Sequence, residues 1–232
     1  MPVLWGSSYT RSDLHARTAD RRQLADVRPF EFTDGAERGV RALRVRNAAG
    51  LDFTVLADRG LSLYDLTFQG VPLGFLTQVG VTHPAYAEQP GLGWLRTWPG
   101  GFLTPCGLTQ VGSPTVEDGE ALGIHGRLSN LPAGQLHWSV ADDGLWVQGV
   151  IRETSVFGVN LVMTRRISAA FDQARVWIDD RVENQGFEAA PLMLLQHFNL
   201  GFPLVDAAAR LILPPHTVAA REIGRASCRE RV

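Results

Sequence analysis

The sequence predicts an all-β protein, a sandwich or barrel of antiparallel strands, and three observations support this. Apolar residues recur at every second position in several segments, and turn-forming residues separate these segments. No stretch of ten or more residues has a convincing helical period. The chain has 232 residues, of which 45% are hydrophobic, so it can bury a substantial core.

The expected strands carry their apolar side chains on one face, which identifies the side that each strand buries. The turns between strands, at 47–50, 142–144 and 184–186, contain Asn, Asp or Gly, which tolerate positive φ angles. The apolar positions of the expected strands are, in chain order, Leu51, Phe53 and Val55; Leu145, Val147 and Ile151; Val159, Leu161, Met163 and Ile167; and Val176, Ile178 and Val182.

The alternation disappears between residues 76 and 134, where Gly and Pro accumulate. A loop-rich stretch of this length inside a compact domain is usually functional or disordered. Its aromatic residues, which include Tyr86, Trp94, Trp98 and Phe102, argue against disorder. We therefore expect this stretch to pack across one face or mouth of the sheet and to carry the site.

The composition excludes several classes of function. A formal net charge of −2 and a pI near 6.3 give no basic surface for a nucleic acid or a membrane. All 22 basic residues are arginines, so no lysine can form a Schiff base or bind phosphate in a P-loop. No apolar run is long enough for a transmembrane helix, and the start, MPVLWGSSYTRSD, has neither the basic region nor the apolar region typical of a signal peptide. We expect a soluble, cytoplasmic protein.

His125 and Arg127 stand two positions apart in the segment GIHGRLSN, residues 123–130. The small residues around them favour exposure of both side chains. Arginine offers a planar fork of donors and histidine can donate or accept, which suits a ligand rich in hydroxyls or carrying an anion. A surface loop without function explains the pattern equally well.

His197 lies in the apolar segment PLMLLQHFNL, residues 191–200, which predicts a buried strand. Alternation places Met193, Leu195, His197 and Asn199 on one face of that strand. A buried His and a buried Asn need polar partners, since each unpaired group costs about 1–3 kcal/mol. The alternative is a core histidine bonded to a backbone carbonyl. A meeting of His125 and His197 in space would favour a functional site.

Three further residues are weaker candidates. Arg59 follows Asp58 where a strand ends, and a local ion pair explains it as well as ligand binding does. Arg96 and Trp98 suit a sugar site, since an aromatic ring can pack on the apolar face of a sugar while Arg binds hydroxyls, although loop aromatics more often form a satellite core. No two histidines have the spacing of metal ligands, and two cysteines, Cys106 and Cys228, do not make a disulfide framework.

The segment 222–232 reads EIGRASCRERV, which looks like the translation of a common short-read sequencing adapter. Foreign segments of this kind are excluded from reasoning about the fold. We therefore expect a native domain, 1–221, that is incomplete at its C-terminus and is followed by a non-native tail.

Four segments, LADRGLSLYDLTFQGVPLGF, GWLRTWPGGFLTPCGL, GIHGRLSN and PLMLLQHFNLGFPL, together resemble the aldose 1-epimerase-like proteins of the galactose mutarotase superfamily. The similarity runs from about residue 4 to residue 211 and is closest to a branch without an assigned substrate. It implies a large antiparallel supersandwich that binds a sugar and interconverts its anomers without a cofactor.

The resemblance also implies roles for particular residues. His197 corresponds to the general acid, His125 to a histidine on the ring-oxygen side, and Arg127 to a ligand of a hydroxyl or an anion. The family's catalytic Glu lies well downstream, whereas Asp206 is the only carboxylate between His197 and Arg221. We therefore expect this chain to lack the base and to be inactive by itself. Two alternatives stay open, a carbohydrate-binding protein without turnover and, more remotely, a cupin-like metal enzyme.

Overall fold

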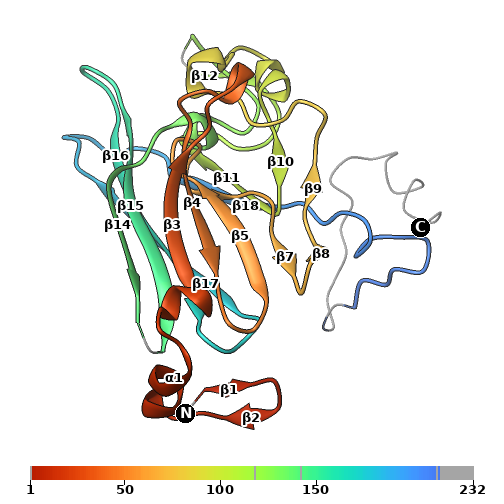
Figure 1. Ribbon diagram of the computed structural model, residues 1–232. Helices are drawn as coiled ribbons and strands as arrows, with labels where there is room; N and C mark the ends of the chain where they lie inside the picture. Colours follow the sequence, from red (N-terminus) through yellow and green to blue (C-terminus); the bar gives the residue numbers. More distant parts are fainter. Residues whose placement is uncertain (1, 118, 142, 213, 215–232) are drawn as a thin grey trace.

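The computed structural model describes residues 2–117, 119–141, 143–212 and 214. In this part of the chain two antiparallel sheets face each other as the layers of a sandwich (Figure 1). The predicted strands between residues 145 and 182 lie in the smaller sheet, and the predicted strands 51–55 and 191–200 lie in the larger one. None of the described helices is long and apolar enough to cross a membrane.

The larger sheet contains eight of the described strands, and all their pairings are antiparallel. Two short strands extend it from β5, namely β7 (Thr67–Phe68) and β8 (Val71–Pro72). The other six follow one another across the sheet in the order β18 (Met193–Phe198), β11 (Leu103–Leu108), β6 (Ser62–Leu63), β5 (Leu51–Leu56), β4 (Arg41–Arg46) and β3 (Asp26–Glu31).

The smaller sheet is a four-stranded meander in the described chain, with each strand paired to the next in sequence. Long alternating segments and short turns account for this simple order. Its strands are β14 (Gly134–Val140), β15 (Gly144–Thr154), β16 (Asn160–Ala170) and β17 (Val176–Asn184).

The core lies between the two sheets. Phe53 and Val55 of β5 belong to the same apolar cluster as Ile151 of β15 and Met163 of β16, and each is at most 1% exposed. Burial of a side chain of this size stabilises the folded state by about 1.5–3 kcal/mol. The inward positions are the alternating ones that the sequence predicted.

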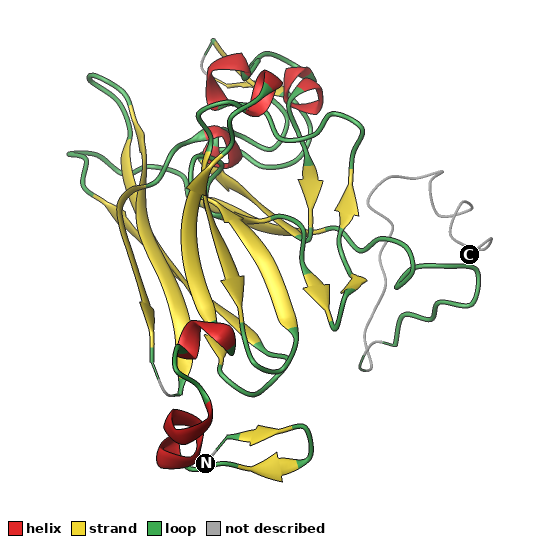
Figure 2. Ribbon diagram, in the orientation of Figure 1, coloured by secondary structure: helices red, strands yellow, loops and turns green. Residues whose placement is uncertain are grey.

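Short elements occupy the two ends of the sandwich (Figure 2). The N-terminal end carries β1 (Val3–Leu4), β2 (Ser7–Ser8), α1 (Arg11–Arg17) and η1 (Arg21–Gln23), and Thr10 and Asp13 form a capping box at the start of α1. The opposite end carries η2 (Gly35–Glu37), η3 (Pro84–Tyr86), η4 (Gly93–Arg96) and η5 (Leu128–Asn130).

The stretch 76–134 supplies most of that second end. Besides its short helices it contains β10 (Gly100–Gly101), which pairs with β9 (Phe75–Leu76), and the hairpin of β12 (Thr115–Glu117) and β13 (Glu120–Leu122). The stretch is therefore ordered over its described residues and packs against the sheet, as we expected.

The prediction that strand β18 is buried is wrong. β18 forms the edge of the larger sheet, and its apolar side chains are 36% to 56% exposed. An uninterrupted apolar run indicates burial on both faces only when other elements cover both faces of the sheet, whereas β18 is the last strand in the order of the larger sheet and, among the described strands, pairs with β11 alone.

A buried ionic network joins the two sheets at β18, the strand that contains His197. Arg165 of β16 is fully buried and lies opposite Asp180 of β17, to which its Nε and Nη2 donate at 2.7 Å each. Gln196 of β18 completes the network, since its Oε1 accepts from Arg165 at 2.9 Å and its Nε2 donates to Asp180 at 2.7 Å. These bonds tie β18 to the smaller sheet.

Candidate active site

The site begins with His197, one residue before the end of β18. Thr104 of β11 is its cross-strand partner, and the pairing fixes the position of the histidine along the sheet. The next side chain, Phe198, packs against Phe102 with ring centroids 5.7 Å apart. Alternation along the strand therefore places Gln196 and Phe198 on the inner face and His197 on the outer face.

Asn199 holds the imidazole of His197. The Nδ1 atom of His197 is in hydrogen-bond contact with Oδ1 of Asn199, as expected for two residues on one strand face. The amide group of Asn199 is buried, and its Nδ2 donates to the carbonyl oxygens of Gly101 at 2.9 Å and of His197 at 3.1 Å. Asn199 thus contacts the candidate histidine directly.

His125 lies in a tight loop that only small neighbours permit. Its φ angle is +62°, which is uncommon for a residue other than glycine. A Cβ atom on Gly126 would lie 2.3 Å from the carbonyl oxygen of Gln110, so a glycine is required there. The N–H of His125 donates to the carbonyl oxygen of Gly112 at 3.0 Å, and the N–H of Gly112 donates to Nδ1 of His125 at 3.3 Å.

Two tryptophans from the same stretch stack on each other beside the histidines. The rings of Trp94 and Trp98 have centroids 4.9 Å apart and planes 19° apart. Each indole N–H has a hydroxyl partner, Oγ of Ser129 for Trp94 at 2.7 Å and Oγ1 of Thr104 for Trp98 at 3.0 Å. These bonds satisfy the polar atoms of both rings and fix the stack on the sheet.

The four rings form one cluster, which we call the Trp–His cluster: Trp94, Trp98, His125 and His197. Trp94 contacts His125 with centroids 5.0 Å apart, and Trp98 contacts His197 at 5.7 Å. The two imidazoles lie 5.3 Å apart. Both histidines and Trp98 are partly exposed, so the cluster combines aromatic surface with two groups that can transfer protons.

The ion-pair partner of Arg127 is a residue outside this cluster. The guanidinium pairs with Glu120 at 3.0 Å and lines a cavity of about 380 Å³. The same cavity is lined by Glu153, whose buried carboxylate accepts the N–H of Leu108 at 2.8 Å and the hydroxyl of Thr109 at 2.6 Å.

Arg59 is buried against the segment 94–98, which carries both tryptophans and which we call the tryptophan loop. Its Nη2 donates to the carbonyl oxygen of Thr97 at 2.7 Å, and its Nη1 donates to Thr82. Burial without a carboxylate lowers the pKa of its guanidinium to about 10. The alternative of an ion pair between Asp58 and Arg59 is wrong, because Asp58 pairs with Arg41 across the sheet.

Arg96 is mainly solvated. Its side chain is 75% exposed and lies 3.5 Å from the carboxylate of Glu88. The structure thus brings together His125, His197, Asn199 and Trp98, whereas the contacts described for Arg59, Arg96 and Arg127 are with other residues.

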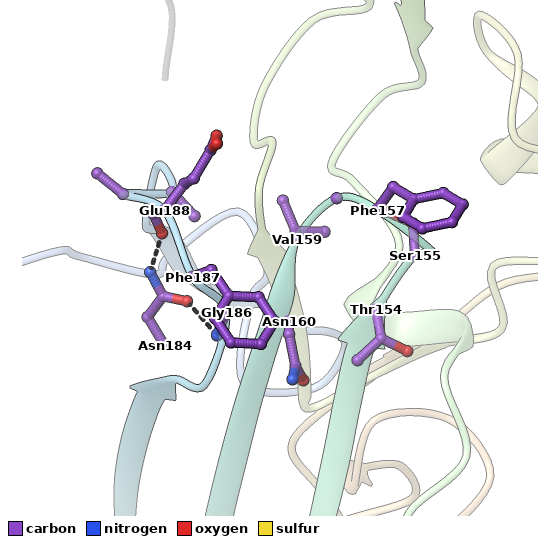
Figure 3. Close-up of a pocket in the computed structure, with 12 residues that line it drawn as sticks. Thr154, Ser155, Phe157, Val159, Asn160, Asn184, Gly186, Phe187 and Glu188 are labelled. Carbon is purple, nitrogen blue, oxygen red and sulfur yellow. Dashed lines mark hydrogen bonds between the residues drawn. The ribbon is translucent and has the colours of Figure 1, made fainter.

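A separate cavity of about 590 Å³ lies at the end of the smaller sheet, between the β15–β16 hairpin and the turn after β17 (Figure 3). Asn184 holds that turn by accepting the N–H of Gly186 at 2.9 Å and donating to the carbonyl oxygen of Glu188 at 2.8 Å. The residues that line it include the exposed rings of Phe157 and Phe187 but no histidine. We therefore place the candidate site at the Trp–His cluster.

Metal binding finds no support in the described residues. They contain no group of three or more His, Cys, Asp or Glu residues placed to hold a metal ion. The cupin-like alternative therefore has no ligand set in this part of the chain.

Several important residues escaped the sequence analysis, although a signal for some of them existed. The inward face of 159–167 is interrupted at Arg165, and that of 176–182 at Asp180. Both interruptions are charged and of opposite sign, and they are cross-strand partners on the neighbouring strands β16 and β17. Two residues of opposite charge at inward positions of successive predicted strands could have predicted this network. Ser129 and Thr104 gave no comparable signal.

The family comparison covers most of the chain. The model of a domain of unknown function, DUF4432, matches residues 37–230. The match extends into the segment 222–232, which lies outside the described residues. No curated protein matches the chain significantly.

Two solved structures resemble this one. A proposed aldose 1-epimerase from Klebsiella pneumoniae subsp. pneumoniae MGH 78578 is 23% identical, with a TM-score of 0.73, over 78% of this chain and 48% of that one. A galactose 1-epimerase from Lactobacillus acidophilus NCFM is 15% identical, with a TM-score of 0.41, over 62% of this chain and 44% of that one. The first likeness confirms the predicted galactose mutarotase-like β-sandwich. The chain spans about half the length of these two proteins.

Proposed function

Since this chain belongs to the DUF4432 family, whose function is unknown, we propose one from the fold and the site: it binds a sugar at the Trp–His cluster and contributes His197 to the interconversion of sugar anomers. The observation that carries the proposal is the meeting of His125 and His197 beside a tryptophan stack. The partly exposed ring of Trp98 offers apolar contact to the carbon face of a sugar, and imidazoles hydrogen-bond its hydroxyls.

Anomer interconversion requires two proton transfers. As the hydroxyl on the anomeric carbon loses its proton to a base, a carbonyl forms there and the bond from that carbon to the ring oxygen breaks. The ring oxygen takes a proton from an acid, and the reverse steps close the ring on either face. A positioned acid or base typically contributes about 100- to 10,000-fold to the rate.

We assign the acid role to His197. Its Nδ1 is held by Asn199, so Nε2 is the nitrogen that exchanges a proton with the ligand. The imidazole of His125 is in contact with that of His197, and we assign His125 to binding on the same side of the sugar. No cofactor enters this scheme, because both transfers are proton transfers between the protein and the sugar.

The base is the open part of the mechanism. In the described part of the chain His197 has no carboxylate partner, and the expected Glu of the related enzymes lies farther along the chain. The described partners of His197 are neutral groups, namely Asn199, Trp98 and His125, which suit a second candidate function, sugar binding without turnover at the same cluster. The two candidates share the binding step and differ in catalysis.

Titration of the full chain with a panel of free aldoses tests the binding step that the two candidates share. Calorimetry and tryptophan fluorescence measure the binding. His197→Ala and His125→Ala should each weaken binding, whereas His137→Ala, an exposed histidine on β14, is the matched control. If no aldose binds, or if the control weakens binding as much as the site variants do, the proposed site is wrong.

Polarimetry of a freshly dissolved α-aldose separates the two functions. A protein with a base accelerates equilibration, and His197→Ala then lowers kcat far more than it raises KM. A protein that binds the same aldose but leaves equilibration at the rate of water is a binding protein.

A further inference from the structure

The loop that contains His125 is held by residues 107–112, which include the end of β11 and which we call the cradle. At one end of the cradle, the N–H of Gly107 donates to the carbonyl oxygen of His125 at 3.1 Å, and the carbonyl oxygen of Gly107 accepts the N–H of Arg127 at 3.0 Å. At the other end, Gly112 accepts the N–H of His125 at 3.0 Å and donates to its Nδ1 at 3.3 Å. The cradle therefore holds both the backbone and the ring of His125.

The loop is also in direct contact with the cradle between these two ends. A Cβ atom on Gly126 would lie 2.3 Å from the carbonyl oxygen of Gln110 and 2.6 Å from that of Gly107. Closely packed backbone leaves no space in which a shift of one segment can be absorbed. A displacement of the cradle therefore moves His125 with it.

Glu153 of β15 holds the middle of the cradle from the smaller sheet. Its Oε2 accepts the N–H of Leu108 at 2.8 Å, and its Oε1 accepts the hydroxyl of Thr109 at 2.6 Å. The residue is 3% exposed, so water competes little for these bonds. An ionised carboxylate can accept at both of its oxygens, which suits two donors on neighbouring residues.

We propose that Glu153 is a positioning residue for His125, which acts on the ligand through the cradle and the imidazole. The contacts lead from the carboxylate to Leu108 and Thr109, and along the cradle to the two glycines that bond to the histidine. The position of the ring does not depend on the proposed function, whereas the effect of Glu153 on sugar binding rests on it.

A different set of side chains connects the strand of His197 to the smaller sheet. Arg165 and Asp180 bond to Gln196, the residue before His197, whereas the bonds of Glu153 are to the cradle. A change at Glu153 should therefore affect His125 more than His197. A general loss of folding would affect both.

Two substitutions at Glu153 separate hydrogen bonding from charge. Glu153→Leu removes both acceptors. Glu153→Gln keeps both bonds, because its amide oxygen accepts the N–H of Leu108 and its NH₂ group donates to the hydroxyl oxygen of Thr109, which can accept as well as donate. Glu188→Leu, at an exposed position in the turn after β17, is the matched control.

NMR of the ligand-free full chain, with carbon-13 in the histidine rings, reads the position of the imidazole. The His125 ring lies 5.0 Å from the ring of Trp94, whose ring current makes the signals sensitive to small displacements. Glu153→Leu should shift the His125 signals and leave those of His15, on α1, unchanged. Glu153→Gln and Glu188→Leu should give the wild-type His125 signals.

The ring signals of the site are assigned from their loss in His125→Ala and in His197→Ala. Unchanged His125 signals in Glu153→Leu overturn the proposal, and so does a larger shift at His197 than at His125. A shift in Glu153→Gln as large as that in Glu153→Leu also overturns it, since the charge and not the hydrogen bonds would then matter.

Aldose affinity tests whether Glu153 acts through His125. Glu153→Leu should weaken binding of an aldose from the panel by about 10-fold, the effect of one unsatisfied buried bond, whereas Glu153→Gln should not. In the His125→Ala background the same leucine substitution should change affinity by less than about twofold, because its effect has already been lost. An equal loss in both backgrounds would mean that Glu153 acts by another route and overturns the proposal.

Thr109→Val keeps the test decisive if Glu153→Leu does not fold. It removes one of the two donors and should shift the His125 signals in the same direction as the leucine variant, by a smaller amount. Unchanged His125 signals in a folded Thr109→Val protein overturn the proposal. If the ring signals respond as expected but no aldose binds, the proposed function fails and the positioning of His125 by Glu153 stands.

Discussion

The imidazoles of His125 and His197 lie 5.3 Å apart, although one belongs to a loop and the other to an edge strand. The loop reaches the strand because glycines allow it to pass close to the backbone of β11. A Cβ atom on Gly126 would lie 2.6 Å from the carbonyl oxygen of Gly107. The contact between the histidines therefore depends on the path of the loop that contains His125, and the site is only as stable as the contacts that hold this loop in place.

The buried ion pair behind β18 should be costly to break from one side. We expect Arg165→Met to lower the free energy of unfolding by about 3–5 kcal/mol, because it leaves Asp180 charged and buried without its partner. Urea unfolding followed by circular dichroism measures the loss. The double variant Arg165→Met/Asp180→Leu should recover most of it, since both charges are then absent. A loss below about 1 kcal/mol in the single variant would show that solvent reaches the pair.

Arg59 should support the tryptophan loop and not the ligand. Arg59→Met leaves the carbonyl of Thr82 without its donor and the carbonyl of Thr97 with only the hydroxyl of Thr82, at 3.0 Å, which should cost about 1–3 kcal/mol in the free energy of unfolding. The same variant should change the fluorescence of Trp98, which follows Thr97 in the chain. A variant with wild-type stability and a large loss of aldose affinity would make Arg59 a ligand-binding residue instead.

The pH dependence of this effect follows from the sign of the pKa shift. Burial lowers the pKa of Arg59 from 12.5 to about 10 in the folded protein, so the folded state binds fewer protons than the unfolded state between these values. The desolvation penalty is fully present below that window and is relieved as the pH rises through it. The difference in stability between wild type and Arg59→Met should therefore be constant from about pH 6 to 8.

Cys106 should be unreactive in the folded protein. Its thiol is fully buried, and burial raises its pKa to about 12. Only the thiolate attacks a disulfide reagent, so Cys106 in a Cys228→Ser variant should not react with Ellman's reagent at about pH 8. Unfolding in guanidinium chloride should release the full signal of one thiol. Rapid reaction without denaturant would mean that the sheet opens at β11.

The strands of the smaller sheet could be predicted from the sequence, because a period of two is a local property of each segment. The inward faces of β15, β16 and β17 follow directly from the alternation of residues such as Val147, Met163 and Ile178. The loop-rich stretch 76–134 was also predicted to carry the site, since aromatic residues in a glycine-rich segment need a surface to pack on. The exposure of β18 could not be predicted, because burial depends on which strands lie beside it.

The sequence by itself determined the fold class and the residue types of the site. Alternation requires only neighbouring positions, the residue pattern singled out His125 and His197, and the resemblance to the mutarotase superfamily added a role for each. Only the tertiary structure decided that these two rings meet, that Asn199 holds one of them and that Arg59 is buried below the tryptophan loop. Each of these contacts joins groups whose positions depend on the register of β18 against β11 or on the close passage of a glycine loop. Such contacts depend on how the whole chain packs, and no local pattern in the sequence records them.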